Sequence, residues 1–334
     1  MDIASIILII IGLCLFETIS SIDNAVINAD VLSTMKPKAQ KWFLLWGLVF
    51  AVFVVRGLLP WLIVYLTNSE LGIIGSFMAT FTSDPKVMEA VELSAPILLM
   101  GGGVFLIFIF FHWLFLEEKN FGLVGEKFIL AQGIWFYAVV SILLTMLVWY
   151  SMKQSSFVAF GAVVGSTAFF ITHGFKQNAE RAEKNLLTKG RMSDISKILY
   201  LEVIDTTFSI DGVLGAFAFT LSVPLIIIGN GLGAFIVRQL TVRNIDSIKK
   251  YVYLKNGAMY SILFLGIIMV LDAFKFNIPS WLSPIVTFLT IGYFFQKSES
   301  ASKRLKKVWK RKNNHSYYLK PQICSKNLLT IYEI

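Results

Sequence analysis

The sequence has few of the residues that form disulfides or soft-metal sites. Its 334 residues include two cysteines and three histidines. Cys14 lies in an apolar run and Cys324 near the C-terminus, so the sequence indicates no disulfide framework. Zinc and copper sites depend mainly on Cys and His side chains, so this composition disfavours both metals. Only 15% of the residues are charged, against about 25% in soluble domains.

Several sequence motifs are also missing. The chain has no GxxxxGK[ST] phosphate-binding loop, which argues against direct nucleotide-driven activity. It has no HExxH, GxGD or GxSxG motif, so we expect no enzymatic activity. Asp2 stands where a secretory signal would have basic residues, and no small-residue cleavage site follows. We therefore expect the first apolar segment to remain as a membrane helix.

Long apolar runs dominate the rest of the chain. Hydrophobic residues make up 56% of it, and several runs reach the roughly 20 residues that cross a bilayer. We predict an all-α fold, a polytopic membrane helix bundle with about nine transmembrane helices in one domain, residues 1–296. The expected spans are approximately residues 3–32, 42–66, 95–116, 129–150, 157–175, 198–221, 256–271 and 281–295, with a further span between the Val223-Pro224 turn and residues 238–243.

The formal net charge of +9 is concentrated behind the last expected span, in a basic tail of residues 297–334 that we expect to be partly disordered. Residues 297–312 contain eight basic residues and one acidic residue, which together contribute +7. Such a segment is typical of a cytoplasmic anchor on anionic lipid, so we expect no nucleic-acid partner. Lys and Arg also gather after the first, fifth and seventh spans, although the mixed-charge loop after the third fits weakly. The positive-inside rule then places the N-terminus outside and the C-terminus in the cytoplasm.

Two polar stretches lie inside apolar spans and are similar to each other. Residues 16–28 read FETISSIDNAVIN and residues 201–213 read LEVIDTTFSIDGV. Aligning their Ser-Ile-Asp triplets also places Glu17 on Asp205. Ionisable side chains in membrane helices are costly and by default mark a functional site, so we predict that this pair forms the binding site of a transporter. The candidate metal-ligating residues are Glu17, Ser21, Asp23, Asn24, Glu202, Asp205, Ser209 and Asp211.

These candidates supply carboxylate, amide and hydroxyl oxygens. Oxygen ligands suit hard cations such as Mn²⁺, Mg²⁺ and Ca²⁺. Two structural alternatives remain open. Single serines and threonines can join helices by hydrogen bonds, and Glu17 can form a purely structural pair with Arg56.

Helical spacing places most polar residues of the first stretch in one stripe. Glu17, Ser21, Asn24 and Asn28 recur at intervals of three or four residues and therefore share a face. Asp23 lies about 120° away from this stripe at 3.6 residues per turn.

The second stretch shows the same division. Glu202, Asp205 and Ser209 share a face, and Asp211 points elsewhere. Either the triplet aspartates serve a separate partner, or each helix is broken near its triplet, where residues such as Gly212 tolerate irregular backbone. We favour the break, because it would free backbone carbonyl oxygens for a cation.

The first span would run inward and the sixth outward. The matched stretches therefore lie on helices of opposite direction, which indicates an inverted-topology repeat with its site near the midplane. Gly47 precedes Arg56 by nine residues, and Gly229 precedes Arg238 by nine, each on the helix after an acidic one. For Arg238 we favour a side chain that extends to the membrane surface, whereas for Arg56 this and a role in the site stay open.

At these motifs the sequence resembles the TerC-like family of integral membrane proteins, named for tellurite resistance. The resemblance rests on residues 17–26 and 202–215, more weakly on residues 231–238, and spans roughly residues 1–300. The similarity is greatest to an uncharacterised branch whose second motif reads Ser-x-Asp-Gly. Other members tend to have Ser or Asn in place of Gly212, so this chain has one side-chain oxygen fewer.

The resemblance implies a multi-pass protein of the bacterial inner membrane, related to the lysine-exporter superfamily, some of whose relatives export Mn²⁺. It implies Asp23, Asn24 and Asp211 as the acidic-motif residues, preceded by Glu17 and Asp205. We expect a secondary exporter of a divalent cation, Mn²⁺ foremost, that exchanges it for protons or sodium and needs no cofactor. The alternatives are an organic-solute exporter and a membrane scaffold that docks soluble stress-response proteins on the basic tail and on residues 176–197.

Overall fold

The computed structural model describes residues 2–21, 25, 28–29, 31–47, 49–50, 57–58, 61–62, 65, 72–81, 85–119, 122–123, 125–189, 193–243 and 251–313. Every described element is a helix, and no strand occurs in these ranges, which confirms the predicted all-α fold. The helices are α1 (Ile3–Ser20), α3 (Pro37–Trp42), the π-helix η1 (Phe43–Gly47), α5 (Gly72–Phe81), α6 (Pro85–Leu116), α7 (Glu126–Leu130), the 3₁₀ helix η4 (Gly133–Trp135), α8 (Phe136–Met152), α9 (Ser156–Lys189), α10 (Asp194–Ala216), α11 (Val223–Arg243), α13 (Leu254–Ala273) and α14 (Leu282–Asn313).

Six stretches of the described helices are long and apolar enough to cross a membrane. They are Ile3–Ser20, Ala95–Leu116, Gly133–Met152, Ser156–Asn178, Val223–Thr241 and Leu254–Ala273. The chain therefore forms a polytopic helical membrane bundle. About half of the residues in the predicted second span, 42–66, lie outside the described residues, and α10 carries four carboxylates along its length.

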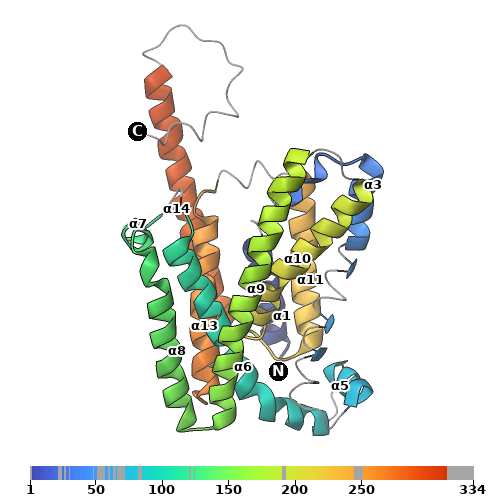
Figure 1. The fold of residues 1–334 in the computed structure, drawn as a ribbon, viewed down its shortest axis with the longest axis vertical. Coiled ribbons are helices and arrows are strands. Elements are labelled where there is room, and N and C mark those ends of the chain that lie inside the picture. The colour runs from blue at the N-terminus through green and yellow to red at the C-terminus, as the bar shows by residue number, and fades with distance from the viewer. Residues whose placement is uncertain are drawn as a thin grey trace.

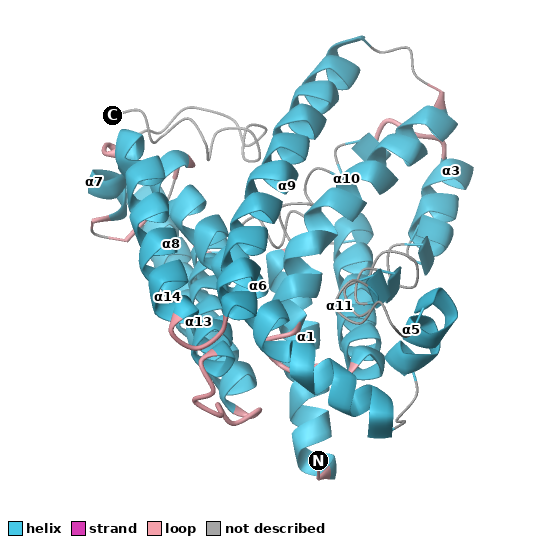
Figure 2. Ribbon diagram, turned by 60° about the horizontal axis from the view of Figure 1, so that its bottom comes forward, coloured by secondary structure: helices cyan, strands magenta, loops and turns pink. Residues whose placement is uncertain are grey.

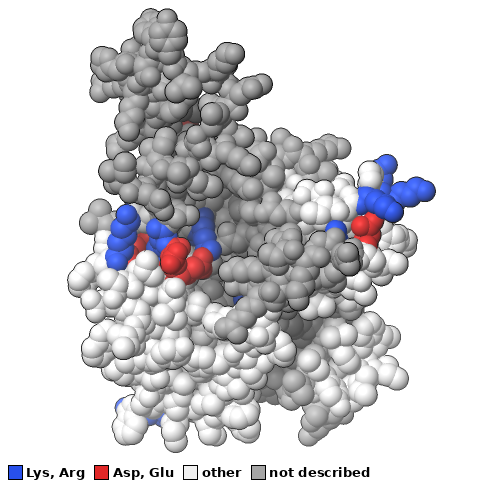
Figure 3. Space-filling model, turned by 45° about the horizontal axis from the view of Figure 1, so that its top comes forward, with Lys and Arg blue, Asp and Glu red and all other residues white. Residues whose placement is uncertain are grey.

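The helices form two groups that pack directly on each other (Figure 1). On one side α13 packs on α14, and α8 lies nearby; on the other side α1 packs on α11. Helix α1 also packs directly on α13 and α14, while α6 and α9 pack against each other and each contacts α10. Figure 2 shows the same helices from another direction. On the face shown in Figure 3, most described charged side chains lie toward the end where α14 projects, and a broad uncharged band lies below them. A band of this kind suits a hydrocarbon environment.

Helices α1 and α10 run in opposite directions, as predicted for the two acidic helices. A Cβ atom placed on Gly212 would lie 2.7 Å from Oε2 of Glu17, and one on Gly12 would lie 3.0 Å from the Phe219 ring. Residue numbers thus rise along one helix as they fall along the other. Helix α11 instead runs parallel to α1. Gly229 faces Leu13, and four residues later Gly233 faces Glu17, so residue numbers rise in the same direction along both helices.

The predicted break in α10 is wrong. This helix begins behind Ser193, whose hydroxyl accepts a hydrogen bond from the Ser196 backbone N–H, and continues without interruption to Ala216. The glycine at 212 instead leaves room for the Glu17 carboxylate of the neighbouring helix. In the first stretch α1 ends at Ser20, and residues 22–24 lie outside the described part of the chain.

The last helix also differs from the expectation. We expected it to end near Phe295, but α14 continues to Asn313 and includes the cluster of basic residues. Lys303 pairs with Glu299 one turn earlier at 2.6 Å, an exposed pair that supports the helix only slightly. The first part of the predicted tail is therefore a helical extension of the last span.

Backbone contact between α6 and α9 is very close. A Cβ atom on Gly165 would lie 2.0 Å from the carbonyl oxygen of Gly101, and one on Gly161 would lie 2.6 Å from that of Ile97. Small residues allow membrane helices to approach so closely that van der Waals contact holds them together.

We expect Gly165→Ala to lower the thermal stability of the detergent-solubilised protein, because overpacking costs about 1–3 kcal/mol. Gly174→Ala on the same helix is the matched control, since no heavy atom lies within 4 Å of its Cβ position. Melting temperatures of both variants test the prediction. Equal melting temperatures for the two variants would show that the α6–α9 contact does not limit stability.

Candidate functional site

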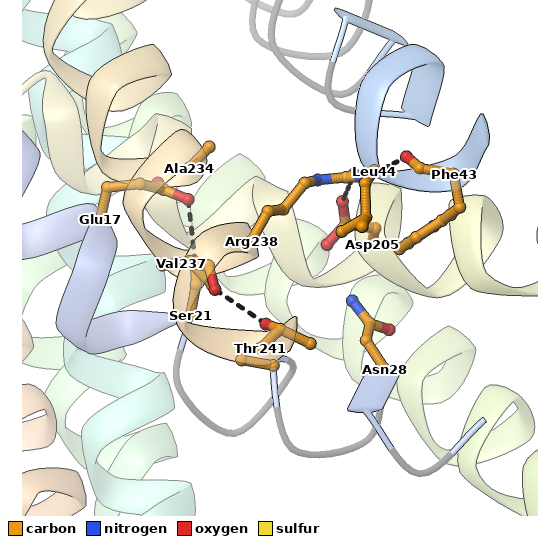
Figure 4. A pocket seen from close by; sticks show the side chains of 11 residues that line it. Glu17, Ser21, Asn28, Phe43, Leu44, Asp205, Ala234, Val237, Arg238 and Thr241 are labelled. Atoms are coloured by element: carbon orange, nitrogen blue, oxygen red, sulfur yellow. Dashed lines mark hydrogen bonds and ion pairs between the residues drawn. The ribbon is translucent and has the colours of Figure 1, made fainter. Parts of the chain in front are cut away.

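One pocket brings the two acidic stretches together (Figure 4). Its walls come from α1 and the residues that follow it, from Phe43 and Leu44 of η1, from α10, and from α11. The space that the centre of a water molecule can occupy inside it is about 20 Å³. The lining residues are Glu17, Ser21, Ala25, Asn28, Phe43, Leu44, Asp205, Ala234, Val237, Arg238 and Thr241.

Glu17 forms one side of the pocket and is almost completely buried, with 1% of its surface exposed. Ser21, one turn later, donates a hydrogen bond from its hydroxyl to Oε1 of Glu17 at 2.8 Å. The glutamate fits between α10 and α11 because both helices have a glycine there. A Cβ atom on Gly233 would lie 2.6 Å from the Glu17 Cβ, and Gly212 faces Oε2.

Asp205 and Arg238 form the opposite side. The Nη2 group of Arg238 donates to Oδ2 of Asp205 at 2.7 Å and lies 4.0 Å from Oε1 of Glu202. Nη1 donates to the backbone carbonyl oxygen of Phe43 at 2.7 Å, and the guanidinium carbon lies 4.4 Å from the centre of the Phe43 ring. Arg238 is buried. Our expectation that it extends to the membrane surface is therefore wrong, because two carboxylates, a carbonyl and a ring hold it inside the bundle.

One amide and one carboxylate near the pocket have buried acceptor atoms without a hydrogen bond inside the described residues. These atoms are Oδ1 of Asn28, which lines the pocket, and both carboxylate oxygens of Glu202. Buried polar atoms in native proteins are nearly always hydrogen-bonded, so such exceptions need an explanation.

Asp211 lies outside the pocket lining and forms an ion pair with Lys176 of α9. Both side chains are largely buried, at 15% and 19% exposure. Beside them the rings of His173 and His112 lie 3.9 Å apart, centre to centre. The structure thus gives Asp211 a basic partner on a different helix from the partner of Asp205.

A further buried carboxylate, Glu126 of α7, has a different environment. Its two oxygens accept hydrogen bonds from Asn256 Nδ2 at 2.9 Å and from the Tyr260 hydroxyl at 3.0 Å. Each of its oxygens has a donor, and the two hydrogen bonds join α7 to α13. This carboxylate therefore has a structural role.

The predicted ligands are thus separated. Glu17, Ser21 and Asp205 line one pocket. Glu202 does not line it but lies near Arg238, which does, and Asp211 lies apart. Asp23 and Asn24 lie outside the described residues, as does the side chain of Ser209. Within the described ranges no group of three or more His, Cys, Asp or Glu side chains is arranged to hold a metal ion.

A family model described as "Protein of unknown function (DUF475)" matches residues 22–305, most of the chain. The chain belongs to the DUF475 family. No curated protein and no solved structure matches it. The match includes the second acidic stretch and Arg238, and it begins just after Ser21.

Sequence reasoning missed several lining residues of this DUF475 protein. Arg238, Thr241 and Phe43 were not among the candidate ligands, and Asn28 was placed on the polar stripe without a role in the site. The equal spacing of Gly47 to Arg56 and of Gly229 to Arg238 was the available signal. In the structure Gly47 does lie against the site, since its Cβ position is 1.9 Å from Oε1 of Glu202.

We expect Asp211→Asn and Lys176→Gln each to destabilise the protein, by at most about 3–5 kcal/mol, because each removes one partner of a largely buried ion pair. The double variant should recover most of the loss, since it leaves two neutral groups that can share a hydrogen bond. Thermal unfolding of the four proteins in detergent measures the coupling. Additive losses would mean that the two residues do not depend on each other.

Proposed function

We propose that this DUF475 protein is a secondary transporter that exports a divalent metal cation, Mn²⁺ foremost, through the pocket between α1, η1, α10 and α11. The observation that carries the proposal is the meeting of Glu17 and Asp205, from two similar stretches far apart in the chain, at one small buried pocket. Carboxylates inside a membrane bundle are costly unless they bind a cation, a proton or a basic side chain.

The charges of the pocket support a divalent substrate. Glu17, Asp205 and Glu202 contribute three negative charges when ionised, and Arg238 contributes one positive charge. Among the described residues the formal sum is −2, which a divalent cation would neutralise. Asp211 does not change this sum, because Lys176 pairs with it.

The donor atoms support a hard cation. Carboxylate oxygens of Glu17 and Asp205, hydroxyls of Ser21 and Thr241, and the Asn28 amide line the pocket. Mn²⁺, Mg²⁺ and Ca²⁺ prefer such oxygen ligands, and Asn28 Oδ1 has no hydrogen-bond donor in the described part of the chain. Asp23 and Asn24 remain proposed ligands from the sequence, together with Ser209 and Asp211.

The volume of the pocket argues against the organic-solute alternative. About 20 Å³ of water-centre space exceeds the roughly 10–15 Å³ that one water needs. Pockets for organic ligands usually enclose hundreds of Å³. An amino acid would therefore require a much larger opening than this conformation provides.

The remaining parts of the proposal come from the sequence. The resemblance to TerC-like proteins and the opposite directions of α1 and α10 favour an inverted-repeat transporter with exchange of the cation for protons or sodium. We propose a location in the bacterial inner membrane, with the N-terminus outside and the C-terminus in the cytoplasm. The basic extension of α14 would then lie at the inner surface, close to anionic lipid.

The proposal is tested by Mn²⁺ flux into proteoliposomes of known orientation that contain the full-length protein. We expect the wild type to transport Mn²⁺, and Glu17→Gln and Asp205→Asn to lose at least about 90% of the flux, because each removes a charged ligand. Glu126→Gln is the matched control, since it neutralises a buried carboxylate outside the pocket and should keep most of the flux.

Two results would contradict the proposal. One is the absence of Mn²⁺, Mg²⁺ and Ca²⁺ flux with wild-type protein that is folded and inserted. The other is normal flux in both pocket variants. If removal of residues 299–334 abolished metal resistance in cells while the pocket variants stayed active, the scaffold alternative would be favoured instead.

A further inference from the structure

We propose that Arg238 is a tethered counter-cation, whose hold on Asp205 competes with the transported cation and promotes its release. This inference rests on the proposed function, because it names a residue that controls affinity at the same pocket. It concerns a side chain that supplies no ligand atom to a metal.

The contacts of Arg238 are divided between carboxylates, Asp205 closely and Glu202 at a longer distance, and two anchors that are not acidic. Nη2 binds Asp205 at 2.7 Å, while Nη1 binds the Phe43 carbonyl oxygen at 2.7 Å and the guanidinium lies over the Phe43 ring. If Asp205 turned toward a bound cation, the guanidinium would keep the carbonyl and the ring. The arginine can therefore give up the carboxylate without leaving its place.

The backbone of η1 makes this arrangement possible. Gly47 has no side chain where Glu202 and Arg238 meet, since a Cβ there would lie 1.9 Å from Glu202 Oε1 and 2.8 Å from Arg238 Nη1. Phe43, one turn earlier in the same π-helix, supplies both the carbonyl and the ring. One short element thus holds the guanidinium at a fixed position between α10 and α11.

Within the described residues, two carboxylates share the charge of Arg238. Arg238 brings one positive charge to both Asp205 and Glu202, and the Glu202 carboxylate lies at the longer distance of 4.0 Å. The carboxylate oxygens of Glu202 have no hydrogen bond in the described residues. An arginine in this position lowers the cost of an empty pocket and leaves enough negative charge to attract a divalent cation.

A competitor for the same carboxylate must weaken cation binding and speed cation release. Removal of Arg238 should therefore raise affinity and lower turnover, whereas the loss of a purely structural arginine would lower both. This opposite change in affinity and turnover distinguishes the two roles.

The test measures Mn²⁺ binding to the purified full-length protein by electron paramagnetic resonance, together with KM and kcat of Mn²⁺ flux in proteoliposomes. We expect Arg238→Gln to bind Mn²⁺ at least about tenfold more tightly, the scale of removing a unit charge within a few ångströms. Its KM and kcat should both fall. Arg238→Lys keeps the charge and should stay close to the wild type. Lys255→Gln, which disrupts a pair with Glu117 in another part of the bundle, is the control for a lost ion pair.

Arg238→Gln can fail to fold, so a charge-balanced variant is measured beside it. Arg238→Gln/Glu202→Gln removes one charge of each sign and leaves the formal sum at −2. Asp205 then lacks its arginine, and Mn²⁺ affinity should still exceed that of the wild type. Affinity that is unchanged or lower in this variant, or in a folded Arg238→Gln, would overturn the proposal.

The results separate this inference from the proposed function. Transport by the wild type with no gain of affinity in either arginine variant overturns the counter-cation and keeps the transporter. Absence of divalent-cation binding and flux in the wild type overturns the proposed function. In that case, an arginine variant that gains Mn²⁺ binding would still support competition between Arg238 and a cation for Asp205. An arginine variant without Mn²⁺ binding would overturn both proposals.

Discussion

The ion pair between Arg238 and Asp205 is the interaction on which the arrangement of the site depends. Burying a carboxylate among apolar helices is unfavourable unless a partner neutralises its charge. An unpaired charge would destabilise the packing of every helix around it. Asp205 can stand inside the bundle because α11 supplies a guanidinium at 2.7 Å, which η1 holds from its other side. Arg238 thus connects α11 to α10 through Asp205 and to η1 through the Phe43 carbonyl oxygen. Asp211 meets the same requirement in a different way, with Lys176 of α9.

Close helix packing is the second condition for the site. Glu17 reaches the pocket only because Gly212 and Gly233 leave space on the two helices beside it. The scaffold formed by α6, α9 and α13 uses the same principle without polar groups: Gly103 of α6 approaches the carbonyl oxygen of Gly266 on α13, with a Cβ position only 2.8 Å away. Backbones that meet at this distance leave little freedom for either helix. Rigid packing around the pocket is what allows a site of few atoms to keep its geometry.

Much of the fold could be predicted because hydrophobic length and charge distribution are local properties of the sequence. The span at 95–116 agrees with the apolar part of α6, and the two residues that the similar stretches align, Glu17 and Asp205, both line the pocket. Which neighbour a side chain meets is not a local property. Periodicity showed that Asp211 lies on a different face from Asp205, but it could not show that Lys176 occupies that face. Gly212 was ambiguous for the same reason, since glycine suits both a broken helix and a close helix contact. Arg238 was misjudged because its nearness to a helix end in the sequence says nothing about the π-helix that covers it.

The difference between Glu126 and the pocket residues bears on the structural alternative for the acids. Buried polar groups that only join helices are expected to have all their hydrogen bonds. Glu126 meets this expectation, with a donor for each oxygen. Glu202, which lies beside Arg238, and Asn28, which lines the pocket, do not meet it in the described residues. Acceptors of Glu202 and Asn28 thus lack donors beside the pocket within the described residues, as do some buried polar atoms elsewhere, such as Oδ1 of Asn230. Helix association alone does not explain acceptors left without donors at a pocket wall, whereas a ligand with positive charge would satisfy them.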